Sequence, residues 1–596
     1  MSGHGFCRRL AQSVASVLLT IVIVVLIVVG GAYLVLNKKT PIKAESWLVL
    51  DLAGDLPAYA PAGSLPGSLL AGDTLTLQDA LDAMGKAALD KRVSGVVWKL
   101  AAGHGAGWGK LQELRDGITA VRDGGKPVYA WAETLDLPTL YLAAACDSIY
   151  QPRGGYCEVR GLMHESMHVR GLLAKLGVTP YVSKLREYKS AAEMLTETRM
   201  TAPAREQAQR LLDHVWEAAV AAITRERDLS REQLLALMEQ SALQPTEAAA
   251  AGLIDRVLYW QDLEAQLLAG AKGKGKDKVK MLPTISPAAY RDVDWSKLGP
   301  KGRETVAVIH AQGMIGGRES GMNPLLGLTM GHESIVRELR RARQSEKVKA
   351  IVLRVDSGGG ESLTSDLIRR EVELCAAAKP TVVSMVDVAA SGGYMISYCA
   401  TKLLANPLSV TGSIGSISAF FDASGLYERL GVGKDAVTVG PMAELGRDAR
   451  APTPAEWQAF ERAHIAGFED WMRGVAEHRN LTFAEVESRA YGRVFTGAEA
   501  AANGLIDGVG NLQAAVREAA SLAGIAPEVP LKLVHLPEPT SPLQQILGGG
   551  RDSGGELSAG PAATVAAWLR WELYRLVRHD LLATVRLLRS GSGLVD

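Results

Sequence analysis

A serine flanked by small residues and a distant lysine are the side chains of this chain best suited to nucleophilic catalysis. Ser391 lies in VDVAASGGYMISYCA, after two alanines and before two glycines. Small neighbours let a substrate backbone approach the hydroxyl, and the N–H of Gly392 could stabilise an oxyanion. Lys189 lies in LREYKSAAEM, among small and apolar residues. To act as a base near neutral pH it must be buried enough to lower its pKa from about 10.4 by several units.

A glycine-rich turn is a second candidate feature. In RVDSGGGESLTSDLIRREV, from Arg354, a strand-like run ends in three glycines before a helix. Such a turn leaves backbone N–H groups free at a helix N-terminus, where they can bind an oxyanion or a phosphate. The chain has no GxSxG elbow and its histidines are scattered, so the sequence does not predict a Ser-His-Asp triad.

The elements that must position these residues occur twice. Residues 93–255 and 348–507 follow one pattern, because VSGVVWKL at Val93 returns as VKAIVLRV at Val348 and AAAAGLIDRV at Ala248 returns as AAANGLIDGV at Ala500. Strand-like Val/Ile/Leu runs alternate with helical stretches in both copies, which predicts two tandem α/β domains with mostly buried parallel sheets. The constant spacing indicates duplication of a domain rather than a short repeat.

The copies differ at the candidate chemical positions. Where the second copy has Ser391, the first reads AETLDLPTLYLAAAC, with Pro138 or Thr139 near the serine position. Where the first copy has Lys189, the second reads TVGPMAELG, with Ala443 at about that position. The sequence therefore predicts one site that takes a nucleophile from one copy and a base from the other.

Composition divides the rest of the 596 residues. Residues 14–36 are almost wholly apolar and uncharged, which predicts a transmembrane anchor. This apolar run is longer than the apolar core of a cleaved signal peptide. Lysines and arginines flank both ends, so charge leaves the orientation open. The predicted parts are an N-terminal tail and anchor (1–44), a first domain (45–270), a polar linker (271–299), a second domain (300–536), a Pro/Gly/Ser-rich tether (537–562) and a basic amphipathic helix (563–596).

Charge and cysteine content exclude some classes of protein. Lysine plus arginine and aspartate plus glutamate both number 65, and neither copy shows a basic face, so nucleic acid is not an expected partner. The five cysteines show no CxxC spacing, which predicts buried thiols rather than disulfides or a zinc ribbon.

The ordered motifs resemble those of the long-form signal peptide peptidase A family, membrane-anchored bacterial serine proteases with tandem crotonase-like or Clp-protease-like domains. The resemblance covers about residues 45–525 and rests on YKSA, DSGGG, AASGGY, TGSIGS and FTGAEAAANGLIDGVG. It implies an endopeptidase without a cofactor or metal that degrades cleaved signal peptides. It also implies a homo-oligomer in the bacterial inner membrane, with its domains on the periplasmic side.

The resemblance also implies a role for each site residue. Ser391 would be the nucleophile, Lys189 the general base, and Ser413 in TGSIG would orient the lysine. Backbone N–H groups around Gly359 and Gly392 would form the oxyanion hole. One departure concerns the turn, because the family commonly has proline where this chain has Gly358, and its loss makes the unfolded turn looser.

Two alternatives come from other classes. His164 and His168 match HExxH, a spacing that places two imidazoles on one helix face around zinc with Glu165 as the base. Glu187 or Glu193 would supply a third ligand. The other alternative is a non-catalytic membrane scaffold, in which the duplicated domains only assemble oligomers and neither Ser391 nor Lys189 is needed.

Overall fold

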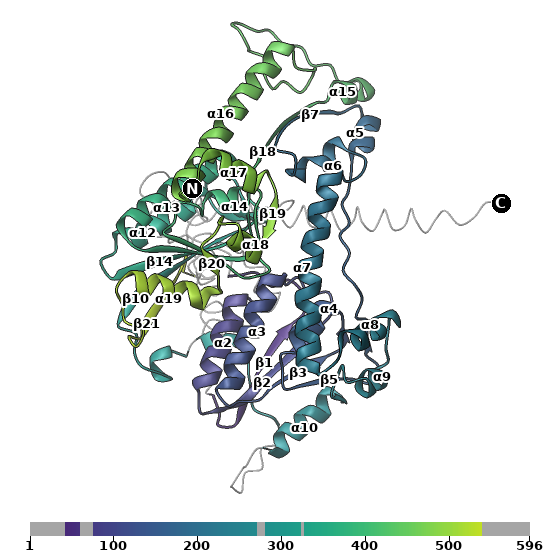
Figure 1. The fold of residues 1–596 in the computed structure, drawn as a ribbon, viewed down its shortest axis with the longest axis vertical. Helices are drawn as coiled ribbons and strands as arrows, with labels where there is room; N and C mark the ends of the chain where they lie inside the picture. The colour runs from purple at the N-terminus through teal and green to yellow at the C-terminus, as the bar shows by residue number, and fades with distance from the viewer. Residues whose placement is uncertain (1–41, 60–74, 271–280, 292, 324–326, 539–596) are drawn as a thin grey trace, which may run out of the picture.

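Two α/β halves, one from each copy, form this computed structural model (Figure 1). The structure describes residues 42–59, 75–270, 281–291, 293–323 and 327–538. Each half contains a sheet whose central strands are parallel and lined by buried aliphatic side chains. The predicted tandem α/β architecture is therefore confirmed.

The two sheets have the same core order. The first has six strands in the order β8-β5-β3-β2-β1-β9, and the second has eight, with β19-β17-β15-β14-β10-β21 as its main path and β16 between β15 and β20. The first sheet consists of β1 (Ser46–Leu52), β2 (Val93–Leu100), β3 (Val128–Ala132), β5 (Ser148–Gln151), β8 (Arg256–Val257) and β9 (Thr284–Ile285). The second consists of β10 (Glu304–Gln312), β14 (Val348–Ser357), β15 (Thr381–Ala390), β16 (Lys402–Ala405), β17 (Val410–Gly412), β19 (Val494–Thr496), β20 (Gly508–Val509) and β21 (Leu531–Leu536). Strands β2 and β3 thus occupy the places that β14 and β15 occupy in the second half.

Helices connect and cover these strands. Those of the first half are α2 (Leu77–Leu89), α3 (Trp108–Asp123), α4 (Leu137–Ala143), α5 (Arg170–Leu176), α6 (Glu193–Thr196), α7 (Ala202–Arg227), α8 (Arg231–Glu239), α9 (Pro245–Ala250), α10 (Trp260–Gly270) and α11 (Pro287–Arg291). Those of the second are α12 (His332–Gln344), α13 (Ser362–Ala378), α14 (Gly392–Met395), α15 (Ser424–Leu430), α16 (Pro454–His478), α17 (Phe483–Ala490), α18 (Gly497–Ala502) and α19 (Leu512–Leu522). Short strands β4 (Thr134–Leu135), β6 (Tyr156–Cys157), β11 (Met314–Ile315), β12 (Gly321–Asn323) and β13 (Gly327–Met330) lie outside the two main sheets.

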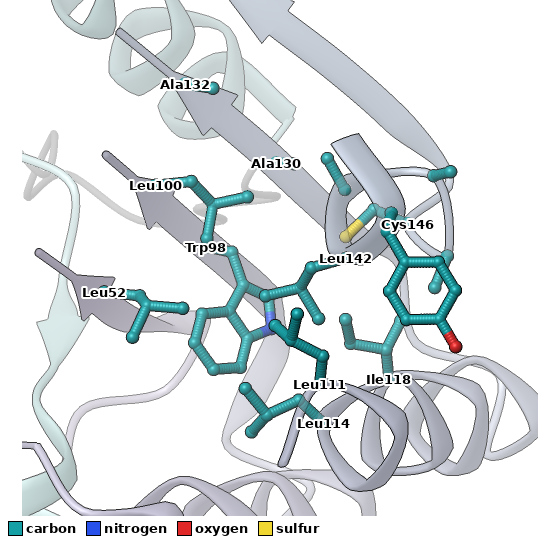
Figure 2. Close-up of a cluster of buried hydrophobic side chains, with 14 of the residues drawn as sticks. Leu52, Trp98, Leu100, Leu111, Leu114, Ile118, Ala130, Ala132, Leu142 and Cys146 are labelled. Atoms are coloured by element: carbon teal, nitrogen blue, oxygen red, sulfur yellow. The ribbon is translucent and has the colours of Figure 1, made fainter. Parts of the chain in front are cut away.

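Helix α3 packs on the first sheet through one apolar face. Leu111, Leu114 and Ile118 recur at helical spacing and lie against Trp98 of β2 (Figure 2). All four side chains are fully buried. This packing fixes α3 on its own sheet while its N-terminal end remains available to the second half.

An ion pair recurs at equivalent positions of the two halves. Arg227 lies 3.0 Å from Asp255, and Arg479 lies 2.8 Å from Asp507. Each aspartate also accepts one backbone N–H, from β5 at 2.7 Å and from β16 at 2.8 Å. Both aspartates belong to the repeated GLID motif, so the duplication read from the sequence extends to side-chain contacts.

A two-stranded ribbon joins the halves. β7 (Thr179–Leu185) of the first half pairs antiparallel with β18 (Ser416–Asp422) of the second. The ring nitrogens of His464 lie 2.9 Å from Ser183 Oγ and 2.8 Å from Ser416 Oγ, one on each strand. Lys189 follows the end of β7 and Ser413 precedes β18, so the ribbon brings these two residues together.

Part of the predicted linker packs on the first sheet. Ile285 and Tyr290 are buried, β9 pairs with β1, and the Tyr290 hydroxyl donates to Asp90 at 3.0 Å. The linker composition comes from the lysines and glycines of residues 271–280, which lie outside the described residues. The apolar residues after this stretch, Ile285 and Tyr290, are buried against the first half.

The predicted anchor (14–36), the tether beyond residue 538 and the C-terminal helix (563–596) also lie outside the described residues. Among the helices that the structure does describe, none is both long enough and apolar enough to cross a bilayer.

Candidate active site

Ser391 occupies the sharp junction between β15 and α14. Its backbone has φ 55° and ψ −118°, a conformation that non-glycine residues rarely adopt and that costs of order 1–3 kcal/mol. Its N–H donates to the carbonyl of Gly412 at 2.9 Å, which holds the junction against β17. A side chain at Gly393 would overlap the carbonyl of Ser357, so glycine is required at this position. The local sequence therefore projects the Ser391 hydroxyl from a strained turn.

Lys189 reaches this hydroxyl from the first half. Its Nζ lies 2.8 Å from Ser391 Oγ and 2.9 Å from both the hydroxyl and the carbonyl oxygen of Ser413. The residue is only 5% exposed. The structure thus brings together Ser391, Lys189 and Ser413, which the sequence separates by up to 224 positions.

Burial sets the charge of the lysine. It lowers the pKa of Lys189 from its ordinary value of 10.5 to about 7, because an ammonium group loses its hydration here. All three of its close contacts are uncharged oxygens, so no carboxylate touches the ammonium to counteract this loss. About half of the lysines are neutral near pH 7 and can accept a proton from Ser391.

This pKa predicts that activity rises with pH. Only neutral Nζ can accept a proton, so peptide-hydrolysis kcat/KM should fall about ten-fold per pH unit well below pH 7 and reach a plateau above about pH 8. The check is a kcat/KM profile from pH 5.5 to 9.5 at constant ionic strength, with folding followed by circular dichroism. A midpoint near 10 would mean that the lysine retains its ordinary pKa and would contradict this prediction.

Two glycines that no sequence pattern singles out make room for the lysine. A Cβ at Gly415 would lie 3.2 Å from Lys189 Cβ, and one at Gly492 would lie 2.9 Å from Lys189 N. Gly492 also has φ 77°, where glycine is favoured. The TGSIG segment contains the first of them, but no sequence signal links Gly492 to a lysine in the other copy.

The two predicted oxyanion glycines lie side by side, but their backbone N–H groups differ in hydrogen bonding. Gly392 is the first residue of α14, so its N–H has no acceptor within that helix. The N–H of Gly359 donates to Ser357 Oγ at 3.2 Å, so it is engaged in this structure. A Cβ at Gly359 would lie 2.5 Å from Gly392 N and 2.8 Å from Ser391 Cβ. The open space before the Gly392 N–H therefore depends on the lack of a side chain at Gly359.

The turn has space for a side chain at Gly358, the position where the sequence departs from the family pattern. A Cβ at Gly358 would meet no heavy atom within 4 Å, and its φ is not in the left-handed region. A side chain at Gly358 would therefore not press on the rest of the turn.

In the first half the equivalent position carries an aspartate. Asp136 is the N-cap of α4, as Ser391 is of α14, whereas Pro138 and Thr139, the residues expected there, lie inside the helix. The Asp136 carboxylate accepts the N–H of Thr139 at 2.9 Å and that of Gly103 at 3.0 Å. A carboxylate thus occupies the backbone donors in the first copy. Ala443 is exposed and lies in the segment after α15.

The HESMH segment does not form the helix that a zinc motif requires. Residues 161–169 are irregular, and α5 begins only at Arg170. The ring nitrogens of His168 contact Ser166 Oγ at 2.9 Å and the Glu193 carbonyl at 3.1 Å. The Glu193 carboxylate instead accepts from Thr201 Oγ1 at 2.8 Å. The spacing argument for two imidazoles on one helix face was wrong because the helix is absent.

Comparisons with known proteins identify the family of this chain. The chain matches Peptidase family S49 twice, over residues 120–273 and 373–526. It is 33% identical over 466 residues to a protein described as "Serine protease SPPA, chloroplastic" from Arabidopsis thaliana, covering 78% of this chain and 68% of the relative. It is 30% identical to "Protease 4" of Haemophilus influenzae, covering 82% and 80%, and 30% identical to "Protease 4" of Salmonella typhi, covering 86% and 85%.

Proposed function

The chain belongs to peptidase family S49 and is a serine protease, and from this we propose that it is an endopeptidase with a Ser391/Lys189 dyad. The observation that supports the dyad most directly is the 2.8 Å separation of Lys189 Nζ and Ser391 Oγ, with the pKa of the lysine lowered to about 7. We also propose that each half has the crotonase or Clp-protease fold.

In the proposed acylation step, Ser391 Oγ attacks the scissile carbonyl while neutral Lys189 Nζ takes its proton. The negative charge on the tetrahedral intermediate develops beside the N–H of Gly392 and the turn at Gly359. The lysine then returns the proton to the leaving amine, and the C–N bond breaks. In deacylation a water molecule attacks the ester, Lys189 accepts its proton, and that proton returns to Ser391 Oγ as the acid leaves.

Ser413 serves this cycle by orienting the lysine. Its hydroxyl and carbonyl oxygen both accept from Nζ at 2.9 Å, which directs the amine toward Ser391 whichever protonation state it holds. Neither oxygen carries a formal charge, so this orientation does not raise the pKa of the lysine as a carboxylate would.

We propose apolar peptides as substrates, including cleaved signal peptides released at a membrane. A cavity of about 650 Å³ opens beside Ser190 and Ser413, and its apolar wall includes Met163, Met167, Met194, Met200, Leu211 and Val494. Methionine side chains adapt to varied apolar shapes, which suits a protease that degrades many sequences. We further propose a homo-oligomer anchored in the inner membrane by residues 14–36, with its domains in the periplasm.

The cavity gives a testable specificity. Met194→Asp places a charge in the apolar wall and should raise KM for an apolar fluorogenic peptide about ten-fold, with kcat within about three-fold, because it weakens ground-state and transition-state binding alike. Steady-state kinetics on the purified protein provide the measurement. Met281→Asp, at a methionine that is 80% exposed and outside the cavity, is the matched control. Equal KM values for the two variants would remove this cavity from substrate binding.

The test of the proposed function is labelling with a fluorophosphonate, a reagent specific for activated serines, followed by peptide mapping. We expect the label on Ser391, together with hydrolysis of apolar peptides that a chelator does not inhibit. Hydrolysis lost to a chelator, with Ser391 unlabelled, would instead support metal chemistry. If Ser391 is not labelled and no peptide is hydrolysed, the result would support the non-catalytic scaffold.

A further inference from the structure

The N-terminus of helix α3, in the first half, is capped by a carboxylate of the second half. Asp387, on β15, accepts the N–H of Lys110 at 2.8 Å and that of Gly107 at 3.2 Å. A side chain at Gly107 would overlap this carboxylate, and one at Gly109 would overlap the Val386 carbonyl. The glycines of the first copy's turn therefore permit a close contact between the halves. A helix N-terminus favours a negative charge, so this contact stabilises Asp387 as a carboxylate.

The Lys110 side chain connects this carboxylate to a second one. Its Nζ lies 2.9 Å from Asp387 Oδ2 and 2.9 Å from Asp356 Oδ2, and all three side chains are at least 85% buried. Although burial alone would lower the pKa of Lys110, the two carboxylates raise it, so the lysine is charged. Burial, with Asp356 close by, raises the pKa of Asp387. One cation thus balances two neighbouring acids.

The two aspartates belong to the strands that carry the reacting groups. Asp356 lies directly before Ser357 and the glycine turn, and Asp387 lies four residues before Ser391 on β15. Regular pairing of β14 with β15 shifts between Val355 and Ser357, so the strand ladder does not hold these two ends in simple register. Asp356 Oδ1 accepts the Val388 N–H at 3.3 Å across this irregularity. The ion cluster is the charged link between the two strand ends.

We propose that Lys110 is a positioning residue for catalysis, which clamps Asp356 and Asp387 so that the glycine turn and Ser391 keep their mutual distance. This inference rests on the proposed Ser391 chemistry and adds to it a requirement for a residue of the first half that touches no substrate. The nearby buried pair of Glu113 and Arg354, 2.5 Å apart, joins α3 to β14 but lies further along α3 than Lys110 does. Lys110 reaches both strand ends next to the site, at Asp356 and at Asp387.

The test measures the rate at which a fluorophosphonate labels Ser391 in the full chain. Lys110→Met keeps the length of the side chain but leaves two carboxylates without their cation. We expect the limiting labelling rate per folded site to fall about 100-fold, as for a displacement of about 1 Å, with the probe's half-saturation concentration within about three-fold. A merely structural role would reduce the fraction of sites labelled and leave the limiting rate unchanged.

A second variant keeps the test decisive if Lys110→Met does not fold. Lys110→Met/Asp356→Asn/Asp387→Asn has no unpaired charge, and asparagine can still cap α3. We expect its limiting rate to lie about ten-fold below wild type, above Lys110→Met where that variant folds. Labelling at the wild-type rate would overturn the clamp, and so would a rate as low as that of a folded Lys110→Met. Arg122→Met is the control, because Arg122 pairs with Asp147 at 2.8 Å within the first half.

The outcomes also separate this inference from the proposed function. If wild-type Ser391 is not labelled, the proposed function fails. If wild-type Ser391 is labelled and folded Lys110→Met is labelled at the same rate, only the clamp fails.

Discussion

Ser391→Ala and Lys189→Met will each lower kcat for peptide hydrolysis by about 10⁴-fold or more. The first removes the only oxygen that Lys189 contacts on the strained β15–α14 junction, and the second removes the base 2.8 Å from it. Because the two groups act as a unit, the double variant should be no slower than the worse single variant. Steady-state kinetics with active-site titration provide the measurement.

Two further lysine variants sharpen this result. Lys189→Arg should be as inactive as Lys189→Met, because a guanidinium does not give up its proton near neutral pH. Lys175→Met, at an exposed lysine on α5, should retain wild-type activity. Substantial activity in Lys189→Arg would show that the position supplies positive charge rather than a base, and would refute the dyad.

The same lysine imposes a cost on stability. The pKa of Lys189 is about 7 in the folded protein and 10.5 ordinarily, so between these pH values the unfolded chain binds more protons than the folded one. Stability therefore rises with pH across this window, and below pH 7 the buried ammonium costs on the order of a few kcal/mol. Lys189→Met should consequently melt at a higher temperature than wild type at pH 6, and the difference should shrink toward pH 10.

Gly359→Ala will lower kcat by about 10²- to 10³-fold, the usual effect of losing an oxyanion donor. The new Cβ would lie 2.5 Å from Gly392 N, in the space that the developing oxyanion needs. The backbone φ of 102° adds strain, because a residue with a side chain rarely adopts it. KM should change far less than kcat, since this space is used mainly in the transition state.

The neighbouring glycine is a matched control for this prediction. Gly358→Ala adds the same methyl group one residue earlier, where no heavy atom lies within 4 Å and φ is not left-handed. It should retain activity within about two-fold. Equal losses in the two variants would indicate that the whole turn is sensitive, and would contradict a specific role for the space beside Gly392.

The sequence predicts the fold well because its signals are local. Repeated apolar runs and the two GLID motifs establish two α/β domains, and the structure has the same strand order in each. The asymmetry between copies likewise singles out Ser391 and Lys189. Their contact could not be derived from spacing, because 202 positions separate them and the joining β7–β18 ribbon depends on pairing between halves.

Other features were missed because they depend on what a neighbouring segment does. HESMH has the letters of a helical zinc site, but α5 starts after it. Asp136 rather than Pro138 or Thr139 takes the serine's place, since a carboxylate caps α4 well. Gly107 and Gly109 of the first copy admit Asp387 to the end of α3, a contact with the other half that no local pattern predicts. Each outcome requires knowledge of a contact in three dimensions.

In the proposed dyad the base and the nucleophile come from different halves, so the site cannot be complete before both halves have been synthesised. A ribosome adds about 5 to 20 residues per second, so the 202 positions between the base and the nucleophile correspond to about 10 to 40 s of translation. During that time the emerging chain holds a lysine with nothing to deprotonate. The site then forms only when β18 of the second half has paired with β7 of the first, because contacts so distant in sequence close late in folding. A chain that ends before Ser391, or whose halves do not dock, would therefore lack the proposed dyad.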